Sequence, residues 1–401
     1  MTPAAQIHNR THAPDTAGGA VARTTSTPTE NRRPEMKKNL VSTTLTRLAA
    51  LLLATTFVHT AMAATFNWTG AGDGTSWNDP DNWGGTAYPG ENQAADVAQS
   101  LEDATATVVI DSAIPYEVND IKANTDVDLN ITTDADISVK DVIRNGGSIV
   151  MDGGRLEKTG ALGSINGEGT LDFTMIGGTL VGTDDLFINS ASTVVGGTGK
   201  VEIADRFRAS DDFTVESGGQ VYDTKNILAI IQDGSTYTVA GGSFTLDNGG
   251  SEFRFRPGGG TFAVEGSSST VTLNEITDSS STAADNKFAF TPDADGTSLI
   301  EVLTTPTEFD LMTLFLNDNT SVAWSGSELP LFDLPGATPL DPTDQFSNAL
   351  EGATFSFTDS TQTHNLEITY QGGDGNAILL TRIIPEPTSL ALLGLGAAAL
   401  L

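Results

Sequence analysis

The sequence contains no cysteine, and this absence excludes disulfide bonds and thiol chemistry. Histidine is nearly as scarce, because His364 is the one histidine after residue 63. A Ser-His-Asp triad would have to use that residue, and a histidine-based zinc or copper site needs more ligands than one imidazole offers. We therefore expect no enzyme, and we interpret His364 as a solvent-exposed loop residue that precedes a strand.

Basic residues are also few. Lysine and arginine number 20 against 52 acidic residues, which gives a formal charge of -32. Such a surface repels nucleic acid, which we exclude as a partner, and it attracts divalent cations. A polysaccharide-degrading groove would need clustered Asp, Arg and Lys side chains. The 13 basic residues after residue 63 make that cluster difficult to assemble.

Glycine is abundant, with 42 residues, and many glycines come in pairs between short alternating strands. The pairs from residue 153 onward are 17 to 24 residues apart when Gly249-Gly250 is taken as a second corner within one turn. This spacing is close to one turn of a parallel β-helix in which glycine occupies positive-φ corners. We predict an all-β chain with a right-handed β-helix, or β-solenoid. A β-sandwich is the alternative, because the repeats are loose in sequence.

Strand alternation predicts which side chains point into the solenoid. The inward set consists of apolar residues at every second position, namely Leu171, Phe173, Val201, Ile203, Val221, Phe244 and Leu246. No stretch between residues 64 and 384 sustains helical apolar periodicity for three turns, so we expect almost no helix.

Three of the four tryptophans, Trp68, Trp77 and Trp83, lie among turn-forming residues near the start of this region. Stacked indoles between turns predict a compact cap over the open end of the solenoid, although aromatic rings beside Asp and Asn can also form a sugar platform. This block, and the strands around 352–380, resemble the N-terminal motif and the closing strands of autotransporter-like β-helical proteins. The resemblance implies β-caps at both ends of a surface protein.

Parallel β-helices include polysaccharide-degrading enzymes, in which paired carboxylates carry the chemistry. Asp184-Asp185 and Asp211-Asp212 are the best adjacent pairs. Glycoside hydrolysis requires two carboxyl groups roughly 5–9.5 Å apart across the sugar. Neighbours on one strand point to opposite faces, so we expect no catalytic pair.

Two short motifs offer oxygen ligands suited to Ca²⁺. Asp293 and Asp295 begin a loop like that of an EF-hand, but Thr304 stands where its bidentate glutamate belongs. Asp374 lies in a segment that resembles the RTX nonapeptide, yet Ala377 replaces the required aspartate and the motif occurs once. We interpret both as solvated turns and expect no cofactor, with Ca²⁺ as the one candidate cation.

The N-terminal region follows the order of a secretion signal. Lys37 and Lys38 precede the apolar run at 48–58, and Ala61 and Ala63 occupy the small-residue positions before the cut. The run is shorter than the ~20 residues that span a membrane. We expect the secretion machinery to export the chain and signal peptidase to cleave it after Ala63 or Ala64. Translation is expected to start at residue 36.

The C-terminal segment carries Pro385-Glu386-Pro387 before an apolar run. It resembles the PEP-CTERM sorting signal, which implies an exosortase-type processing enzyme and delivery to the cell envelope or exopolysaccharide matrix. The arginine cluster of that family does not follow Leu401, so either the sequence is truncated there or the signal is incomplete.

These patterns predict an exported structural or adhesive protein of the cell envelope or extracellular matrix, with exopolysaccharide as a possible partner. The alternative is a polysaccharide-binding or polysaccharide-degrading β-helix. The expected segments are a disordered extension (1–35), the signal peptide (36–63), a Trp-rich cap with first strands (64–126), solenoid turns (127–299), a C-terminal β-cap (300–382) and the sorting tail (383–401).

Overall fold

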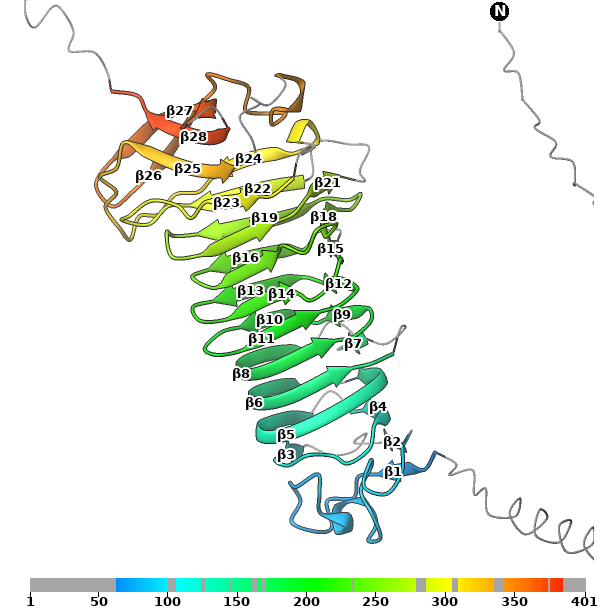
Figure 1. The fold of residues 1–401 in the computed structure, drawn as a ribbon. Helices are drawn as coiled ribbons and strands as arrows, with labels where there is room; N and C mark the ends of the chain where they lie inside the picture. The colour runs from blue at the N-terminus through cyan, green and yellow to red at the C-terminus, as the bar shows by residue number, and fades with distance from the viewer. Residues whose placement is uncertain are drawn as a thin grey trace, which may run out of the picture. The chain divides into compact units, whose positions relative to one another are not determined.

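The structure is a computed structural model. It describes residues 63–384 apart from gaps at 95, 100–105, 124–126, 145, 161–163, 167–170, 233, 279–285, 305–308, 335–341 and 374–375. These residues form a β-solenoid of about eight turns, as Figure 1 shows, which confirms the predicted all-β solenoid. No helix among them is long and apolar enough to cross a membrane.

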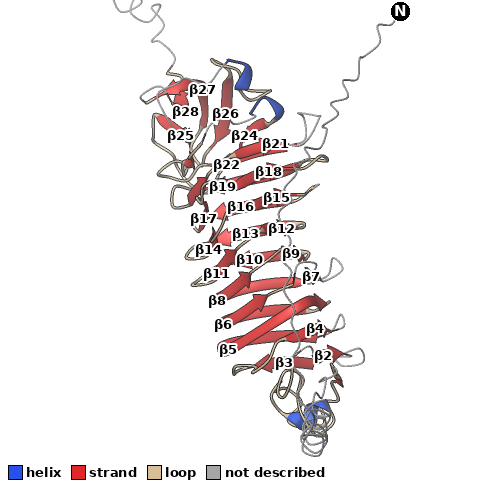
Figure 2. Cartoon of the chain, turned by 45° about the vertical axis from the view of Figure 1, so that its right-hand side comes forward, coloured by secondary structure: helices blue, strands red, loops and turns tan. Residues whose placement is uncertain are grey.

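The solenoid has three faces, each a stack of parallel strands (Figure 2). The first face contains β3 (Ala106–Ile110), the first parts of β5 (Val127–Arg144), β6 (Ser148–Lys158) and β8 (Asp172–Gly182), then β10 (Ser192–Val195), β13 (Asp212–Glu216), β16 (Thr236–Ala240), β19 (Gly260–Glu265), β22 (Asn286–Thr291) and β24 (Thr313–Leu316). Its register sets the turn length. Ser192 pairs with Asp212 and Asp212 with Thr236, so these turns take 20 and 24 residues.

The second and third faces follow the first in each turn. The second face contains later parts of β5, β6 and β8, then β11 (Lys200–Ile203), β14 (Gln220–Asp223), β17 (Ser243–Leu246), β20 (Thr270–Leu273), β23 (Ile300–Val302) and β25 (Glu328–Asp333). The third face contains β1 (Thr65–Asn67), β2 (Asp96–Gln99), β4 (Val118–Lys122), the end of β5, β7 (Ser164–Asn166), β9 (Leu186–Asn189), β12 (Arg206–Ala209), β15 (Leu228–Ile231), β18 (Glu252–Phe255) and β21 (Ile276–Asp278).

Apolar side chains from all three faces fill the interior. The seven residues predicted to point inward are all 0% exposed.

Glycine occupies corners of the solenoid where the backbone leaves no room for a side chain. At Gly178 φ is +82°, and an added Cβ would lie 2.1 Å from the carbonyl oxygen of Gly153 in the turn before. The glycine pairs therefore mark corners because successive backbones approach too closely there for a side chain.

Parallel turns continue beyond the predicted boundary at residue 300. β22 still pairs with β24, and β23 with β25, in the parallel sense. A turn at 292–296 lies between β22 and β23, and the inward apolar column continues past it through Ile300 and Phe332. The antiparallel strands β26 (Thr354–Thr358), β27 (Thr363–Gly372) and β28 (Ala377–Arg382) then join β25.

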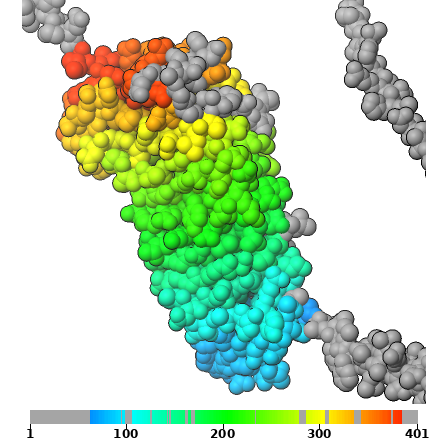
Figure 3. Space-filling model, in the orientation of Figure 1, coloured from blue at the N-terminus to red at the C-terminus, as the bar shows by residue number. Residues whose placement is uncertain are grey.

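Short 3-10 helices accompany both ends of the solenoid. They are η1 (Pro80–Trp83), η2 (Phe309–Leu311) and η3 (Pro342–Asp344). Figure 3 shows the closely packed surface of the stack, coloured in turn order from the N-terminal to the C-terminal end.

Candidate functional site

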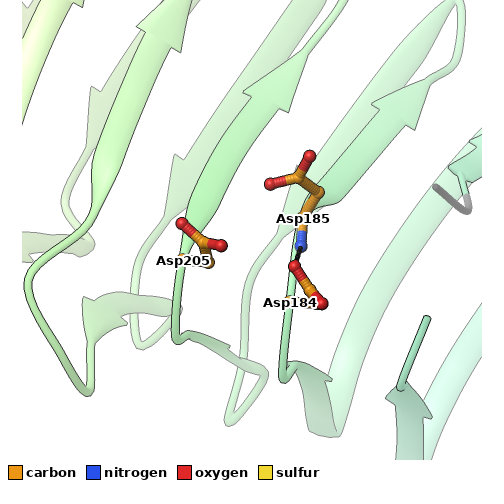
Figure 4. A group of neighbouring side chains, drawn as sticks. All are labelled: Asp184, Asp185 and Asp205. Carbon is orange, nitrogen blue, oxygen red and sulfur yellow. Dashed lines mark hydrogen bonds between the residues drawn. The ribbon is translucent and has the colours of Figure 1, made fainter. Parts of the chain in front are cut away.

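Three carboxylates gather at the corner between the second and third faces (Figure 4). Asp184 and Asp185 lie in the turn between β8 and β9, and Asp205 lies in the turn between β11 and β12. The register pairs Gly182 with Ile203 and Leu186 with Phe207, so Asp184 and Asp205 hold equivalent corner positions. One oxygen from each aspartate lies within 4.8 Å of the others.

This cluster differs from the sequence expectation. Asp184 and Asp185 were expected on one strand with opposite orientations, but they lie in a turn, and stacking brings in Asp205 from the next turn. The other adjacent pair gains no such third group among the described residues, and both Asp211 and Asp212 are exposed. Sequence adjacency therefore mattered less than the position of each aspartate within its turn.

Arg206 compensates part of the charge of this cluster. Its Nε donates to Asp185 Oδ1 at 2.8 Å, and its Nη2 lies 2.7 Å from Asp185 Oδ2. Asp205 has no such partner. Burial raises the pKa of Asp205, and the negative charges of Asp185 and Asp184 raise it further. The cluster therefore holds one satisfied carboxylate and two stacked carboxylates that repel each other.

Lys158 lies beside the same corner and is 0% exposed. It occupies an inward position of the second face, in register with Gly182 of the next turn. Its Nζ donates to the carbonyl oxygens of Lys140 and Gly160, both at 2.5 Å. Burial lowers the pKa of Lys158, and the charges of nearby carboxylates, including Asp184, oppose that shift.

The arrangement limits the chemistry available at the corner. Oxygen atoms of Asp184 and Asp205 lie within 4.8 Å of each other, which is too close to hold a sugar between the two carboxyl groups. Three aspartates could present oxygen ligands to Ca²⁺, but Arg206 already occupies Asp185. The geometry is that of an ion-pair network.

Replacing Asp205 with asparagine is expected to stabilise the protein by a few tenths of a kcal/mol at neutral pH, because it removes exposed like-charge repulsion. The raised pKa of Asp205 means that the wild type also gains this stability as the pH falls through that pKa, so the difference between the proteins should shrink in acid. Urea midpoints at two pH values test this. A destabilised variant at neutral pH would show that the carboxylate has an unrecognised favourable partner.

Arginines on the third face were missed by the sequence reasoning. β12 contains Arg206-Phe207-Arg208, and Arg254-Phe255-Arg256 spans the end of β18. Both central phenylalanines are 0% exposed and point inward. Strand alternation therefore directs the flanking arginines outward. The repeated Arg-Phe-Arg triplet was the signal that could have identified them.

Acidic and basic side chains do meet at this corner of the solenoid. Arg206 contacts Asp185, Lys158 lies at the same corner, and Arg208 follows on the same strand as Arg206. A few basic residues sufficed because a parallel stack brings positions about 20 residues apart into direct contact.

The predicted tryptophan cluster forms a buried network at the start of the solenoid. The ring of Trp83 meets those of Trp68 and Trp77 edge-on, with centroid distances of 4.9 and 4.8 Å. The indole nitrogen of Trp77 donates to the carbonyl oxygen of Pro89. The three side chains are 7%, 0% and 5% exposed, so they present no open ring surface for a sugar. This geometry fits a cap.

Asp293 and Asp295 lie in one loop, where the backbone N–H of Asp295 donates to Asp293 Oδ1 at 2.9 Å. Burial raises the pKa of Asp293, but hydrogen bonds from Ser267 and the following loop outweigh it and hold that pKa below its ordinary value. Asp295 and Ala63 are exposed, and Ala64 is half-buried.

Several predicted residues fall outside the described part of the chain, namely Ala61, Asp374, Pro385, Glu386 and Pro387.

His364 is not the exposed loop residue that the sequence suggested. It lies in β27 and is 1% exposed. Its Nε2 is 2.8 Å from Asp359 Oδ2, and its ring stacks on Phe357 with centroids 5.0 Å apart. The polar residues around it in sequence form a tight turn around Asp359, and this turn directs the imidazole into the cap.

Comparison with known proteins identified no match, whether to protein-family models, curated proteins or solved structures.

Proposed function

We propose that this chain is an exported structural or adhesive protein of the cell envelope or extracellular matrix, sorted through a PEP-CTERM-like tail. The main support is the placement of a regular β-solenoid between a signal-peptide pattern and the Pro-Glu-Pro motif. Eight stacked turns at about 4.8 Å make a rod of roughly 40 Å, long enough to present three extended polar faces.

The ends of the solenoid also favour a stable surface scaffold. The buried tryptophan cluster covers the first turns, and β26–β28 add antiparallel strands to the last ones. Terminal units that shield the open core keep a solenoid soluble. A net charge of -32 acts in the same direction, because it disfavours association between copies.

Changing Glu386 to alanine is expected to abolish tail processing in a bacterial host that has an exosortase, since the tripeptide is the recognised element in the resembled family. The measurement is the C-terminal mass of the exported protein, together with its distribution among membrane, matrix and medium. Glu328→Ala, on β25, is the control with the same change of charge, and it should be processed as the wild type. Equal processing of wild type and Glu386→Ala would contradict sorting through this motif.

A further inference from the structure

We propose that the third face of the solenoid binds an acidic polysaccharide through the arginines of its two Arg-Phe-Arg triplets, Arg206, Arg208, Arg254 and Arg256. The seven arginines that follow residue 63 include these four, so more than half of them lie within three consecutive turns. This proposal rests on the proposed function, because that function places the protein in a polysaccharide matrix.

The register fixes the spacing of two arginines along the face. Arg208 pairs with Ile230, and Ile230 pairs with Arg254 in the following turn. The two arginines therefore share one outward column and are two strand spacings apart, about 9.5 Å. That separation is on the order of two sugar residues in an extended chain, so consecutive arginines can meet carboxylates along a polyuronate.

Two of the arginines are held by carboxylates of the protein. Arg206 contacts Asp185, and Arg254 donates from Nε and Nη2 to Glu252 at 2.7 and 2.5 Å. The side chains of Arg206 and Arg254 are 48% and 35% exposed, so they are oriented by these carboxylates and still reachable from solvent.

The other two lack such partners among the described residues, where neither Arg208 nor Arg256 forms an ion pair. The guanidinium carbon of Arg208 lies 3.7 Å from the ring centroid of Phe187, and its buried Nε has no hydrogen-bond partner. Burial, followed by the charges of Arg256 and Arg206, lowers the pKa of Arg208. A ligand carboxylate that reached the Nη groups of Arg208 would relieve this repulsion.

The chemistry favours a polyuronate over other polyanions. Arginine matches a carboxylate through two parallel hydrogen bonds, and a polyuronate carries one carboxylate per sugar. Nucleic acid has a denser charge, which the acidic remainder of this protein repels more strongly. A neutral glycan would gain nothing from the guanidinium groups.

The test is calorimetric titration of the full exported chain with sodium polygalacturonate at low ionic strength. Dextran serves as the neutral glycan and oligothymidylate as the competing polyanion. We expect binding to polygalacturonate that weakens with added salt, and no comparable binding to the other two probes.

Replacing Arg208 and Arg256 together with glutamine should weaken this binding about tenfold or more. Lys200→Gln with Lys287→Gln is the matched control, because it removes the same charge from the second and first faces, and it should change affinity less than about twofold. Circular dichroism establishes that each variant is folded.

The proposal is overturned if polygalacturonate does not bind, if both double variants weaken binding equally, or if oligothymidylate binds as well as polygalacturonate. The result is separable from that of the Glu386→Ala experiment. Binding in solution does not depend on the tail, and tail processing does not depend on the third face.

Discussion

Phe173→Asp is expected to destabilise the solenoid by about 4 kcal/mol or more, or to prevent folding. Phe173 is 0% exposed and lies in the inward column of the first face, between Ile149 and Thr193 of the adjacent turns. Removing the ring alone costs about 3–5 kcal/mol, and the carboxylate adds a charge with no partner in a dry stack.

The neighbouring residue supplies the control. Asp172 is exposed at the start of the same strand, and Asp172→Asn should change the free energy of unfolding by less than about 0.5 kcal/mol. Denaturant midpoints followed by far-UV circular dichroism compare the variants. Phe173→Leu, which keeps an apolar side chain, provides a folded variant of intermediate stability if the aspartate variant does not accumulate. Equal effects at residues 172 and 173 would contradict the register of β8.

The fold could be predicted because its two main determinants are local. Alternation fixes which residues of a short strand face inward, and paired glycines mark corners where backbones of successive turns meet. The register gives turns of 20 and 24 residues around Asp212, within the range inferred from glycine spacing. The C-terminal boundary was less predictable, because a turn-rich insertion between parallel strands looks like the end of the repeat.

The candidate site could not be predicted in the same way, because it depends on contacts between turns. Asp184 and Asp205 meet only if the number of residues between them equals the length of that solenoid turn. The loose sequence repeats do not fix the length of each turn. The outward direction of Arg208 was predictable from the buried Phe207 beside it. Its alignment with Arg254, two turns later, again required the register.

His364 shows a further limit of sequence reasoning. Its surroundings in sequence are polar, which is typical of an exposed turn. Its burial depends on Trp324, which lies 40 positions earlier in the sequence. The Trp324 ring meets the imidazole edge-on, and the two ring centroids are 4.9 Å apart. Nothing in the local pattern around His364 encodes that contact.

Asp359→Ala is expected to lower the midpoint of thermal unfolding by roughly 10 °C, because it removes one partner of a buried His-Asp pair. Asp359 accepts hydrogen bonds from the backbone N–H groups of Trp324, Thr361 and Gln362 as well as from His364. The alanine variant would leave these donors without their acceptor inside the cap.

The pH dependence of stability separates the role of the Asp359 charge from simple packing. Burial raises the pKa of Asp359, but the hydrogen bonds from His364, Thr361 and Gln362 outweigh it and hold that pKa well below its ordinary value. A depressed carboxyl pKa contributes stability that is complete above about pH 4 to 5 and is lost as the pH falls toward the folded-state pKa. The gap between wild type and Asp359→Ala should therefore narrow in acid.

Two further variants complete the test of the pair. His364→Phe keeps a ring against Phe357 and removes one of the five donors to Asp359, so it should cost less than Asp359→Ala. Asp295→Ala changes an exposed aspartate and should leave the midpoint nearly unchanged. The measurement is the midpoint of thermal unfolding of the wild type and each variant, from pH 7 down to acidic pH. A gap between wild type and Asp359→Ala that stays constant over this range would mean that Asp359 supports the cap through packing and not through its charge.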